Sequence, residues 1–522
     1  MPDGTTLGVA TAVAVGLCVA RNYWRAKRPV EQVHLRGRFL REPPKEASAS
    51  SGSVDSVGIR LGRHLFPSAI ATRHFAFIGT TGSGKTLLQR LLLQSALGCL
   101  GQGHGHRALV YDAKQDLLGL LGGMCVSVPI QILNPLDARS ARWDMAADIQ
   151  SPAAALQVAS TLVPAATHDA NPFFTNAARH LLYGTVLSLI ELCPRRWTLR
   201  HVLLLLREPE RLQTLLSRTE STRHLLNYFA HAATAQNIFS TVLTYTSPFE
   251  IIAACWDRAG DALSLSAWLD TESVLVLGND EQNRSALDTL NKLLFQRLAE
   301  LVLAGPEVDE RNIHTRRTWF FLDEVREAGK LDLLGRLLTK GRSKGVAVVL
   351  GFQDISGMRV VYGREQADEL IGQCNTKVIL RLNSPETAAW AAKLFGTREV
   401  LEMRRGHSKT RRTSLRGEAS SGDSVSHAIA QQPLVLDSEF LDLPETTHAN
   451  GLHAYFINPT TGPFEDHIDA AWLTKHLMPP HPKTQNFIPR PSAHQYLRSW
   501  CAEDDALLGF DPIPVNSKGR GQ

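Results

Sequence analysis

Short apolar runs alternate along most of the chain with longer segments of helical periodicity. The runs are rich in β-branched and aromatic residues, which is typical of buried strands; they lie at 75–78, 108–112, 273–278, 319–322, 346–352, 376–381 and 452–457. After the first run, Leu87, Leu88, Leu91 and Leu92 fall at helical spacing. This alternation predicts an α/β fold, a mostly parallel sheet with helices on both faces.

One long stretch breaks the alternation, because it contains helical patterns and few strand-like runs. Residues 153–162, 177–192 and 202–206 are the clearest helical segments in it. We interpret 151–268 as an inserted all-α domain, which divides the α/β core into a first part at 60–150 and a second part at 269–475. The alternative is a set of helices layered directly on the sheet.

The first apolar run is followed by Gly79-Thr80-Thr81-Gly82-Ser83-Gly84-Lys85-Thr86, which satisfies G-x-x-x-x-G-K-[ST]. Strand, loop and helix come in the order that a P-loop requires. Its backbone N–H groups and the helix N-terminus bind phosphate oxygens. We predict that Lys85 reaches the β- and γ-phosphates of ATP and that Thr86 gives its hydroxyl to Mg²⁺.

The run at 319–322 ends in two adjacent acids, Asp323 and Glu324. Ligands of open α/β sheets bind at the carboxyl ends of strands, so both acids are candidates for the same site. Neighbouring strand residues point to opposite faces, which predicts different roles. We expect Asp323 to hold Mg²⁺ and Glu324 to act as general base on the attacking water. The alternative is a strand end that only caps the next helix.

Two further polar residues occupy positions where an ATPase places a sensor and a finger. Gln353 follows the run at 346–352, where its amide would report the state of the γ-phosphate; without a partner in the site it is a plain loop amide. Arg342 lies in the basic segment 340–345 and is a candidate arginine finger on a neighbouring subunit. Basic loop residues are otherwise most often simply solvated.

The N-terminus carries an apolar segment. Residues 5–20 are free of charge, and counting 4–24 gives about the length of a membrane-spanning helix. Positive charge follows it at Arg21, Arg25, Lys27 and Arg28, which predicts a short membrane anchor at 1–28 with the bulk of the chain in the cytoplasm. The alternative is a soluble protein with an apolar N-terminal helix. Residues 29–59 are interpreted as a linker and 476–522 as a Pro-rich, disordered tail.

The net charge of +5 on 522 residues does not by itself indicate nucleic-acid binding. Basic residues nevertheless gather at Arg398, Arg404, Arg405, Lys409, Arg411, Arg412 and Arg416. A flexible basic loop there would follow DNA phosphates without recognising bases, although a solvated face explains it equally well. The seven cysteines show no C-x-x-C spacing, which is typical of a reducing compartment.

Taken together, the motifs resemble the coupling-protein ATPases of bacterial conjugation and type IV secretion, the TraG and TraD group. The resemblance covers about residues 60–460. It is carried by the P-loop region 73–86, by Val110-Tyr111-Asp112-Ala113-Lys114, by the acidic block 322–331, and by 341–345, 351–354, Tyr362-Gly363 and Glu386-Thr387-Ala388.

The resemblance implies a RecA-like P-loop NTPase core and assigns nucleotide, metal and base roles to Lys85, Thr86, Asp323 and Glu324. It implies that Arg342 acts in trans and that Gln353 senses the γ-phosphate. The family function is an ATP-driven translocase that couples a relaxase-bound, single DNA strand to a type IV secretion channel. The expected assembly is a homo-hexameric ring at the bacterial inner membrane, whose helical domain meets DNA-processing partners.

Two other functions remain open from the sequence. One is a pump for double-stranded DNA of the FtsK or HerA type. The other is an adaptor that uses ATP as a switch and recruits secretion substrates without motor activity. The family also usually begins with two transmembrane helices, whereas this sequence offers one marginal candidate.

Overall fold

The computed structural model describes residues 31–44, 58–124, 126–165, 172–309, 315–411 and 419–509, apart from the side chains of 404–423. The chain divides into two compact units. The larger comprises Glu42–Thr387 with Phe440–Gln522, and the smaller comprises Met1–Arg41 with Ala388–Glu439. The predicted anchor at 1–28 lies outside the described residues, as do residues 29–30 and 45–57 of the predicted linker.

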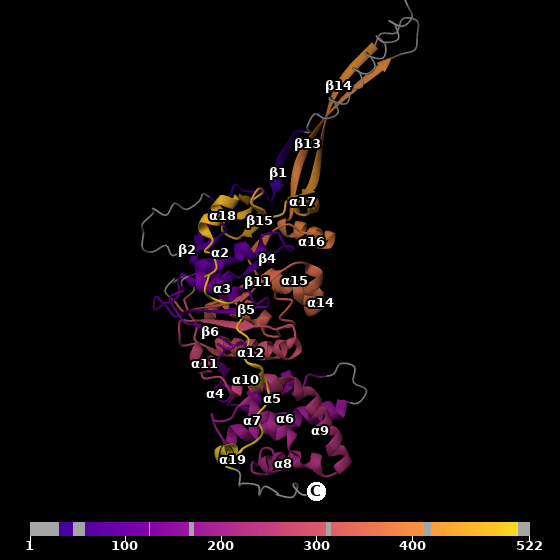
Figure 1. Ribbon diagram of the computed structural model, residues 1–522. Coiled ribbons are helices and arrows are strands. Elements are labelled where there is room, and N and C mark those ends of the chain that lie inside the picture. The colour runs from indigo at the N-terminus through magenta and orange to yellow at the C-terminus, as the bar shows by residue number, and fades with distance from the viewer. Residues whose placement is uncertain are drawn as a thin grey trace, which may run out of the picture. The chain divides into compact units, whose positions relative to one another are not determined.

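A nine-stranded sheet forms the centre of the larger unit (Figure 1). The order is β16-β15-β12-β4-β11-β10-β5-β9-β6. From β12 to β6 all neighbours are parallel, while β15 and β16 add an antiparallel edge. In that order the strands span Gly462–Ile468, Leu452–Asn458, Thr376–Ile379, Phe75–Ile78, Val346–Phe352, Arg317–Leu322, His106–Asp112, Val274–Gly278 and Ile130–Ile132. The predicted mostly parallel sheet is confirmed.

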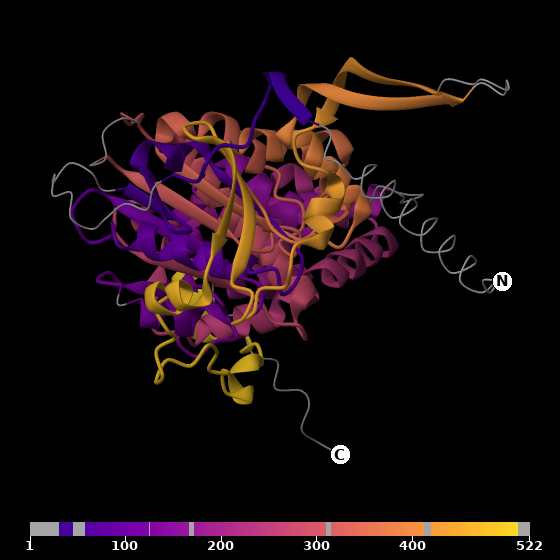
Figure 2. The same ribbon diagram turned by 90° about the horizontal axis from the view of Figure 1, so that it is seen from above.

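Helices cover both faces of this sheet, as Figure 2 shows from above. On one face, α2 (Lys85–Leu97) and α3 (Leu117–Gly123) bury their leucines against Trp319 and other sheet residues. On the other face, Phe295 of α12 (Arg284–Ala304) packs edge-on against Phe320, with ring centroids 5.7 Å apart. Successive strand residues thus face opposite layers, as a fully buried sheet requires. The remaining elements near the core are β2 (Gly58–Leu61), β3 (His64–Pro67), α13 (Leu334–Lys340), α14 (Ile355–Tyr362), α15 (Arg364–Gln373) and α18 (Ala470–His476).

The inserted helices form a lobe that the chain enters and leaves through one neck. β7 (Arg142–Trp143) and β8 (Ala262–Leu263) pair side by side. Buried Asp148 ties the two passages together, because it accepts from Trp143 Nε1 at 2.7 Å and from the Leu265 N–H at 2.7 Å. The helices are α4 (Met145–Asp148), α5 (Pro152–Leu162), α6 (Pro172–Leu192), α7 (Leu199–Arg207), α8 (Pro209–Ser217), α9 (Ala232–Thr246), α10 (Glu250–Asp257) and α11 (Leu265–Trp268). An all-α insertion is therefore present, and the bounds 151–268 stay a prediction.

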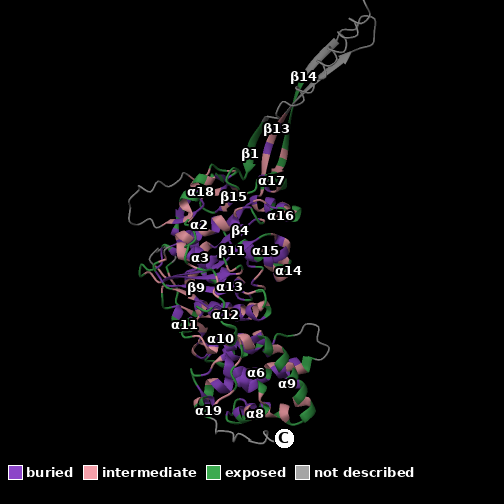
Figure 3. Ribbon diagram, viewed as in Figure 1, coloured by how far each residue is buried: buried purple, intermediate pink, exposed green. Residues whose placement is uncertain are grey.

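The lobe has its own apolar interior. Figure 3 shows α6 largely buried at its centre. Leu181, Leu182, Val186 and Leu189 of this helix are at most 1% exposed. Gly184 lets a neighbour approach closely, since a Cβ there would lie 2.2 Å from Leu225 Cδ1. This separate core favours an independent domain over helices layered on the sheet.

One helical stretch among the described residues, Ala232–Asp257, is long and apolar enough to cross a membrane by length and composition alone. It has 26 residues and a mean hydropathy of 1.3 in its most apolar window. The stretch lies in the helical lobe, where α9 packs against α6. Core helices of soluble proteins pass the same test, so it is weak evidence for a membrane span.

The expectation of a disordered tail is wrong for the part of it that the structure describes. After α18 the chain crosses the core, where buried Arg490 donates to the carbonyl oxygens of Pro135, Asp137 and Ser140 at 2.9–3.1 Å. It then reaches the lobe and ends in α19 (Ala502–Leu508). We call residues 477–509 the C-terminal strap. The composition of the strap does not predict its ordered path, because that path is fixed by hydrogen bonds to residues far away in the sequence.

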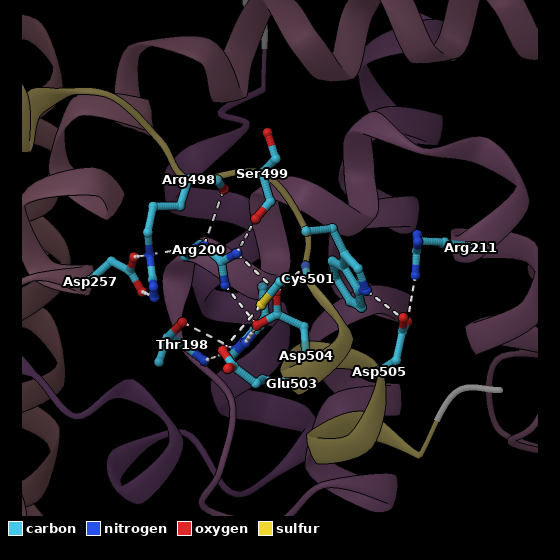
Figure 4. A network of polar contacts seen from close by, with 12 residues as sticks. Thr198, Arg200, Arg211, Asp257, Arg498, Ser499, Cys501, Glu503, Asp504 and Asp505 are labelled. Carbon is cyan, nitrogen blue, oxygen red and sulfur yellow. Dashed lines mark hydrogen bonds and ion pairs between the residues drawn. The ribbon is translucent and has the colours of Figure 1, made fainter. Parts of the chain in front are cut away.

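Figure 4 shows how the strap attaches to the lobe. Arg200 of α7 donates to both carboxylate oxygens of Asp504, at 2.8 and 2.9 Å. Arg211 of α8 donates to Asp505 at 2.6 Å, and Arg498 donates to Asp257 of α10 at 2.5 Å. Hydrogen bonds from Arg200 and the Cys501 N–H outweigh burial and lower the pKa of Asp504 far below its ordinary value. The strap is thus bound to both core and lobe.

The smaller unit corrects two further expectations. β1 (Glu31–Gly37), β13 (Thr397–Arg411) and β14 (Ala419–Pro433) form a three-stranded antiparallel sheet. The strand β1 occupies part of the predicted linker, and the predicted flexible basic loop is a long hairpin from Arg398 to Arg411. β13 pairs with β14 over its full length, so these residues form a strand and not a flexible loop, and they belong to the smaller unit. The unit is joined to the rest of the chain by α16 (Pro385–Phe395) and α17 (Asp437–Asp442). Arg412 and Arg416 lie outside the described residues.

Candidate nucleotide site

The loop from Gly79 to Gly84 connects β4 to α2 and has the backbone of a phosphate cradle. Gly82 and Gly84 adopt φ values of +78° and +89°, which side chains with a Cβ rarely tolerate. At Gly79 a Cβ would lie 2.5 Å from Ser83 Oγ, so the turn closes on itself. Lys85 and Thr86 open α2, where the first N–H groups have no intrahelical acceptor. These N–H groups therefore remain available to an anion.

The sheet order explains how distant residues converge on this loop. β11 lies between β4, which carries the P-loop, and β10, which carries the acids. All three strands are parallel, so their carboxyl ends meet at one edge. Gln353, directly after β11, consequently lies between the two motifs.

Lys85 contacts both predicted acids. Its Nζ lies 3.0 Å from Glu324 Oε2 and 3.9 Å from Asp323 Oδ1. Gln353 Nε2 donates to the same Glu324 oxygen at 3.4 Å. β10 ends at Leu322 and both acids lie in a turn, and Glu324 lines one cavity while Asp323 lines another. Strand alternation does not apply to them.

Lys85, Glu324 and Gln353 line a cavity of about 250 Å³. Its walls comprise Thr80, Thr81, Gly82, Gly84, Lys85, Thr86, Leu87, Lys114, Glu324, Gln353 and Thr446. Gly79 and Ser83 of the P-loop are not among these wall residues, but their N–H groups hold the turn in place. The Gly79 N–H donates to the Phe352 carbonyl at 3.3 Å, and the Ser83 N–H donates to the Thr80 carbonyl at 3.2 Å. The cavity combines a phosphate cradle, two cations and a buried carboxylate.

The residues predicted to hold Mg²⁺ share a smaller cavity. Thr86 and Asp323 both line a space of about 20 Å³, whose other walls are mostly apolar side chains of α2 and the sheet. Asp323 Oδ1 is buried and has no hydrogen-bond partner among the described residues. An orphaned carboxylate oxygen and a hydroxyl from two residues that line the same space are oxygen donors of the kind that Mg²⁺ prefers. The residues present therefore fit the ion.

Other acids lie nearby. Burial raises the pKa of Asp112, at the end of β5, to about 6, although the N–H groups of Leu117 and Asp116 oppose the rise. Burial also raises the pKa of Asp116; the charge of Asp323 adds to that rise, while Lys114 opposes it. Negative charge is thus concentrated near Asp323, where a divalent cation would relieve it.

Arg342 is not in this cavity. It is exposed and opens the short 3₁₀ turn Arg342–Lys344, directly before β11. The cavity lies at the carboxyl end of β11, roughly 20 Å away along the strand. Arg342 instead lines a second cavity of about 550 Å³ together with Arg336, Lys340 and Lys344. Arg342 therefore does not reach the nucleotide cavity of its own chain, and its action on a neighbouring subunit stays a prediction.

Two residues of the cavity received no role from the sequence. Lys114 follows β5, and its only sequence signal is its place in the segment 110–114. Thr446 lies before β15 and had no sequence signal at all, because it reaches the P-loop only through the pairing of β15 with β12. The parallel-strand pattern could have indicated Lys114, which follows the end of a buried strand.

Comparison with known proteins agrees with this arrangement. Residues 60–459 match the family model of the type IV secretion-system coupling protein DNA-binding domain. The chain is 25% identical over 456 residues to the coupling protein TraD of Escherichia coli K12, which covers 84% of this chain and 60% of TraD. It is 31% identical over 130 residues to the conjugal transfer protein TraG of Agrobacterium fabrum C58, covering 24% of this chain and 18% of TraG. The chain therefore spans less than two thirds of these curated relatives.

Solved structures share the fold. The bacterial conjugative coupling protein TrwBdeltaN70 superposes with a TM-score of 0.65 at 21% identity, covering 89% of this chain and 97% of that one. The plasmid coupling protein TrwB, solved in complex with ADP and Mg²⁺, superposes with a TM-score of 0.64 at 20% identity and covers 88% and 98%. The predicted RecA-like core with an inserted all-α domain is thereby confirmed. With the family model matched over most of its length, the chain belongs to the type IV secretion-system coupling protein family.

Proposed function

We propose that the protein is an ATP-driven translocase that couples a relaxase-bound DNA strand to a type IV secretion channel. The observation that carries the proposal is the convergence of Lys85, Glu324 and Gln353 at one cavity, with Lys85 Nζ 3.0 Å from Glu324 Oε2. Lysine, base and sensor candidates lie far apart in the sequence, and a shared cavity is what an NTP hydrolase needs. Family membership supports the coupling role.

ATP and Mg²⁺ are the proposed ligands. Related TrwB structures contain ADP with Mg²⁺ or the ATP analogue ADPNP. In this chain the P-loop from Gly79 to Thr86 would bind the phosphates, and Thr86 and Asp323 would hold the ion. When bound, Mg²⁺ neutralises charge that develops on the phosphate oxygens during transfer.

Each protein group then has a distinct task. Lys85 would exchange its carboxylate partner for the β- and γ-phosphates. Release of Glu324 from that ion pair leaves its carboxylate available to orient and deprotonate water. Gln353, which shares the same Glu324 oxygen, would register whether the γ-phosphate is present. Because Gln353 directly follows β11, this contact would couple ATP binding to the position of that strand.

A ring of subunits completes the proposed site. No arginine is among the residues that line the described nucleotide cavity, and Arg342 lies at the opposite edge of the sheet. An arginine supplied by a neighbour would stabilise charge in the transition state. A homo-hexamer, with DNA in its channel and the inner membrane beside it, is the assembly that this family suggests. Relaxase and secretion-channel proteins are the proposed partners.

Steady-state ATP hydrolysis by the assembled full-length protein, with and without single-stranded DNA, tests the proposal. We expect turnover that DNA stimulates and that Lys85→Ala abolishes, because the P-loop lysine is the main positive charge on the phosphates. A conjugative transfer assay with the same variant connects turnover to transport. Hydrolysis that ignores DNA, or none in the assembled protein, would favour the ATP-switched adaptor. Stimulation by double-stranded DNA alone would favour a pump of the FtsK or HerA type.

A further inference from the structure

A short turn before β15 reaches the P-loop from outside. Thr446 donates twice to it: its N–H to the Gly82 carbonyl at 3.1 Å, and its hydroxyl to the Ser83 carbonyl at 2.8 Å. The contact is close, since a Cβ on Gly84 would lie 2.7 Å from Thr446 Oγ1. Thr446 also lines the nucleotide cavity.

These bonds fix the direction of the P-loop peptide groups. A trans peptide unit is planar, so its C=O and N–H point in opposite directions. Holding the Ser83 carbonyl at Thr446 therefore directs the Gly84 N–H away from Thr446. The next carbonyl, that of Gly84, accepts from the Leu87 and Leu88 N–H groups of α2 at 3.0 and 3.2 Å, so the Ser83–Gly84 peptide is the last one before the helical hydrogen bonds begin.

The turn that carries Thr446 is itself anchored. Arg381, just after β12, donates to the Glu445 carboxylate at 2.5 Å, and its carbonyl accepts the Thr80 N–H at 3.0 Å. Asn450 Nδ2 closes the turn by donating to the Glu445 carbonyl at 3.0 Å. One connected set of contacts thus holds both the start and the end of the P-loop.

We propose that Thr446 is a positioning residue for nucleotide binding, whose hydroxyl holds the Ser83–Gly84 peptide in the orientation that binds phosphate. The inference rests on the proposed ATPase function. It extends the site beyond the motif to the antiparallel edge of the sheet. Without the hydroxyl, the peptide can rotate, and part of the binding free energy of the triphosphate is used to order it again.

Titration of the full-length protein with a fluorescent ATP analogue and Mg²⁺ tests this proposal. Loss of one hydrogen bond to a carbonyl predicts a dissociation constant about fivefold higher in Thr446→Val than in the wild type. Thr446→Ser keeps the hydroxyl and should restore affinity. Thr447→Val is the matched control, because the Thr447 hydroxyl accepts from the Asn450 N–H within the same turn and does not bond the P-loop.

The outcomes separate the two proposals. If the wild type does not bind the analogue, the proposed ATPase function fails. If the wild type binds and Thr446→Val binds equally well, the positioning role fails and the function stands. An equal loss of affinity in Thr447→Val would also overturn the positioning role, because affinity would then depend on the intact turn and not on the Thr446 hydroxyl.

Discussion

The nucleotide cavity and the C-terminal strap both join a buried cation to a carboxylate from a distant part of the chain, but they do so differently. Arg200 grips Asp504 with two parallel hydrogen bonds, and the Cys501 N–H and His201 also contact that carboxylate. Lys85 makes one short contact to Glu324 and leaves Asp323 Oδ1 without a hydrogen bond among the described residues. A satisfied pair stabilises a fold, whereas an incompletely satisfied pair beside a cavity is available to a ligand.

The largest expected effect is a loss of ATP turnover when a carboxylate of the nucleotide cavity is changed. Glu324→Gln removes the general base while keeping the shape of the side chain. We expect turnover to fall about 100-fold or more, with the affinity for ATP retained. Steady-state hydrolysis and nucleotide titration of the same preparation measure both. Asp504→Asn, in the strap, should leave turnover per folded subunit unchanged; a matching loss there would show that the two pairs are not functionally distinct.

In the strap, the corresponding substitution should act on stability. Arg200→Ala leaves the Asp504 carboxylate buried without its main partner, which costs about 3–5 kcal/mol. Urea unfolding monitored in the lobe, for instance by protease cleavage, should show the loss. The control is Arg223→Ala, which breaks an exposed pair with Glu220 in the same lobe and is expected to change stability by less than about 1 kcal/mol. Equal effects from both variants would contradict a structural role for the strap.

The smallest expected effect concerns pH and compares Asp112, the buried acid at the end of β5, with Asp504 of the strap. Because the pKa of Asp112 is raised to about 6 in the folded chain, the native state holds a proton that the unfolded state releases above pH ~4. Its contribution to stability is therefore present below pH ~4 and is lost as pH rises to about 6, by at most about 2–3 kcal/mol.

Asp112→Asn should remove that part of the pH dependence. Urea midpoints of the wild type and the variant, compared between pH 4.5 and 7, provide the measurement. If the urea midpoints of the two proteins changed in parallel with pH, the pKa of Asp112 would not be raised in the folded chain. The depressed pKa of Asp504 has the opposite sign, because its contribution is lost only as pH falls into the strongly acidic range.

Much of the core was predictable because its signals are local. The run at 75–78 coincides with β4 and the run at 346–352 coincides with β11. A buried parallel strand needs a continuous apolar run, and a P-loop needs glycines at fixed positions. The acids and Gln353 were found for the same reason, since each directly follows such a run. Their convergence could be anticipated because parallel strands end at one edge.

What the sequence could not decide depends on partners that are distant along the chain. The basic segment from Arg398 lacks a strand-like apolar run, yet pairing with β14 and β1 makes it a strand. The turn at Thr446 and the strap around Asp504 look like polar loops, since hydrogen bonds from Arg381 and Arg200 supply their order. The same holds for the two acids, which follow the end of β10 in a turn and both lie within 3.9 Å of Lys85 Nζ.

By itself, then, the sequence determined the α/β core, the helical insertion and the identity of the phosphate-binding loop, because periodicity and glycine spacing are written into neighbouring residues. Only the tertiary structure decided which side chains surround that loop and where the C-terminal residues lie. Hydrogen bonds and ion pairs between segments hundreds of residues apart have no local pattern, so their geometry emerges when the sheet order brings those segments together.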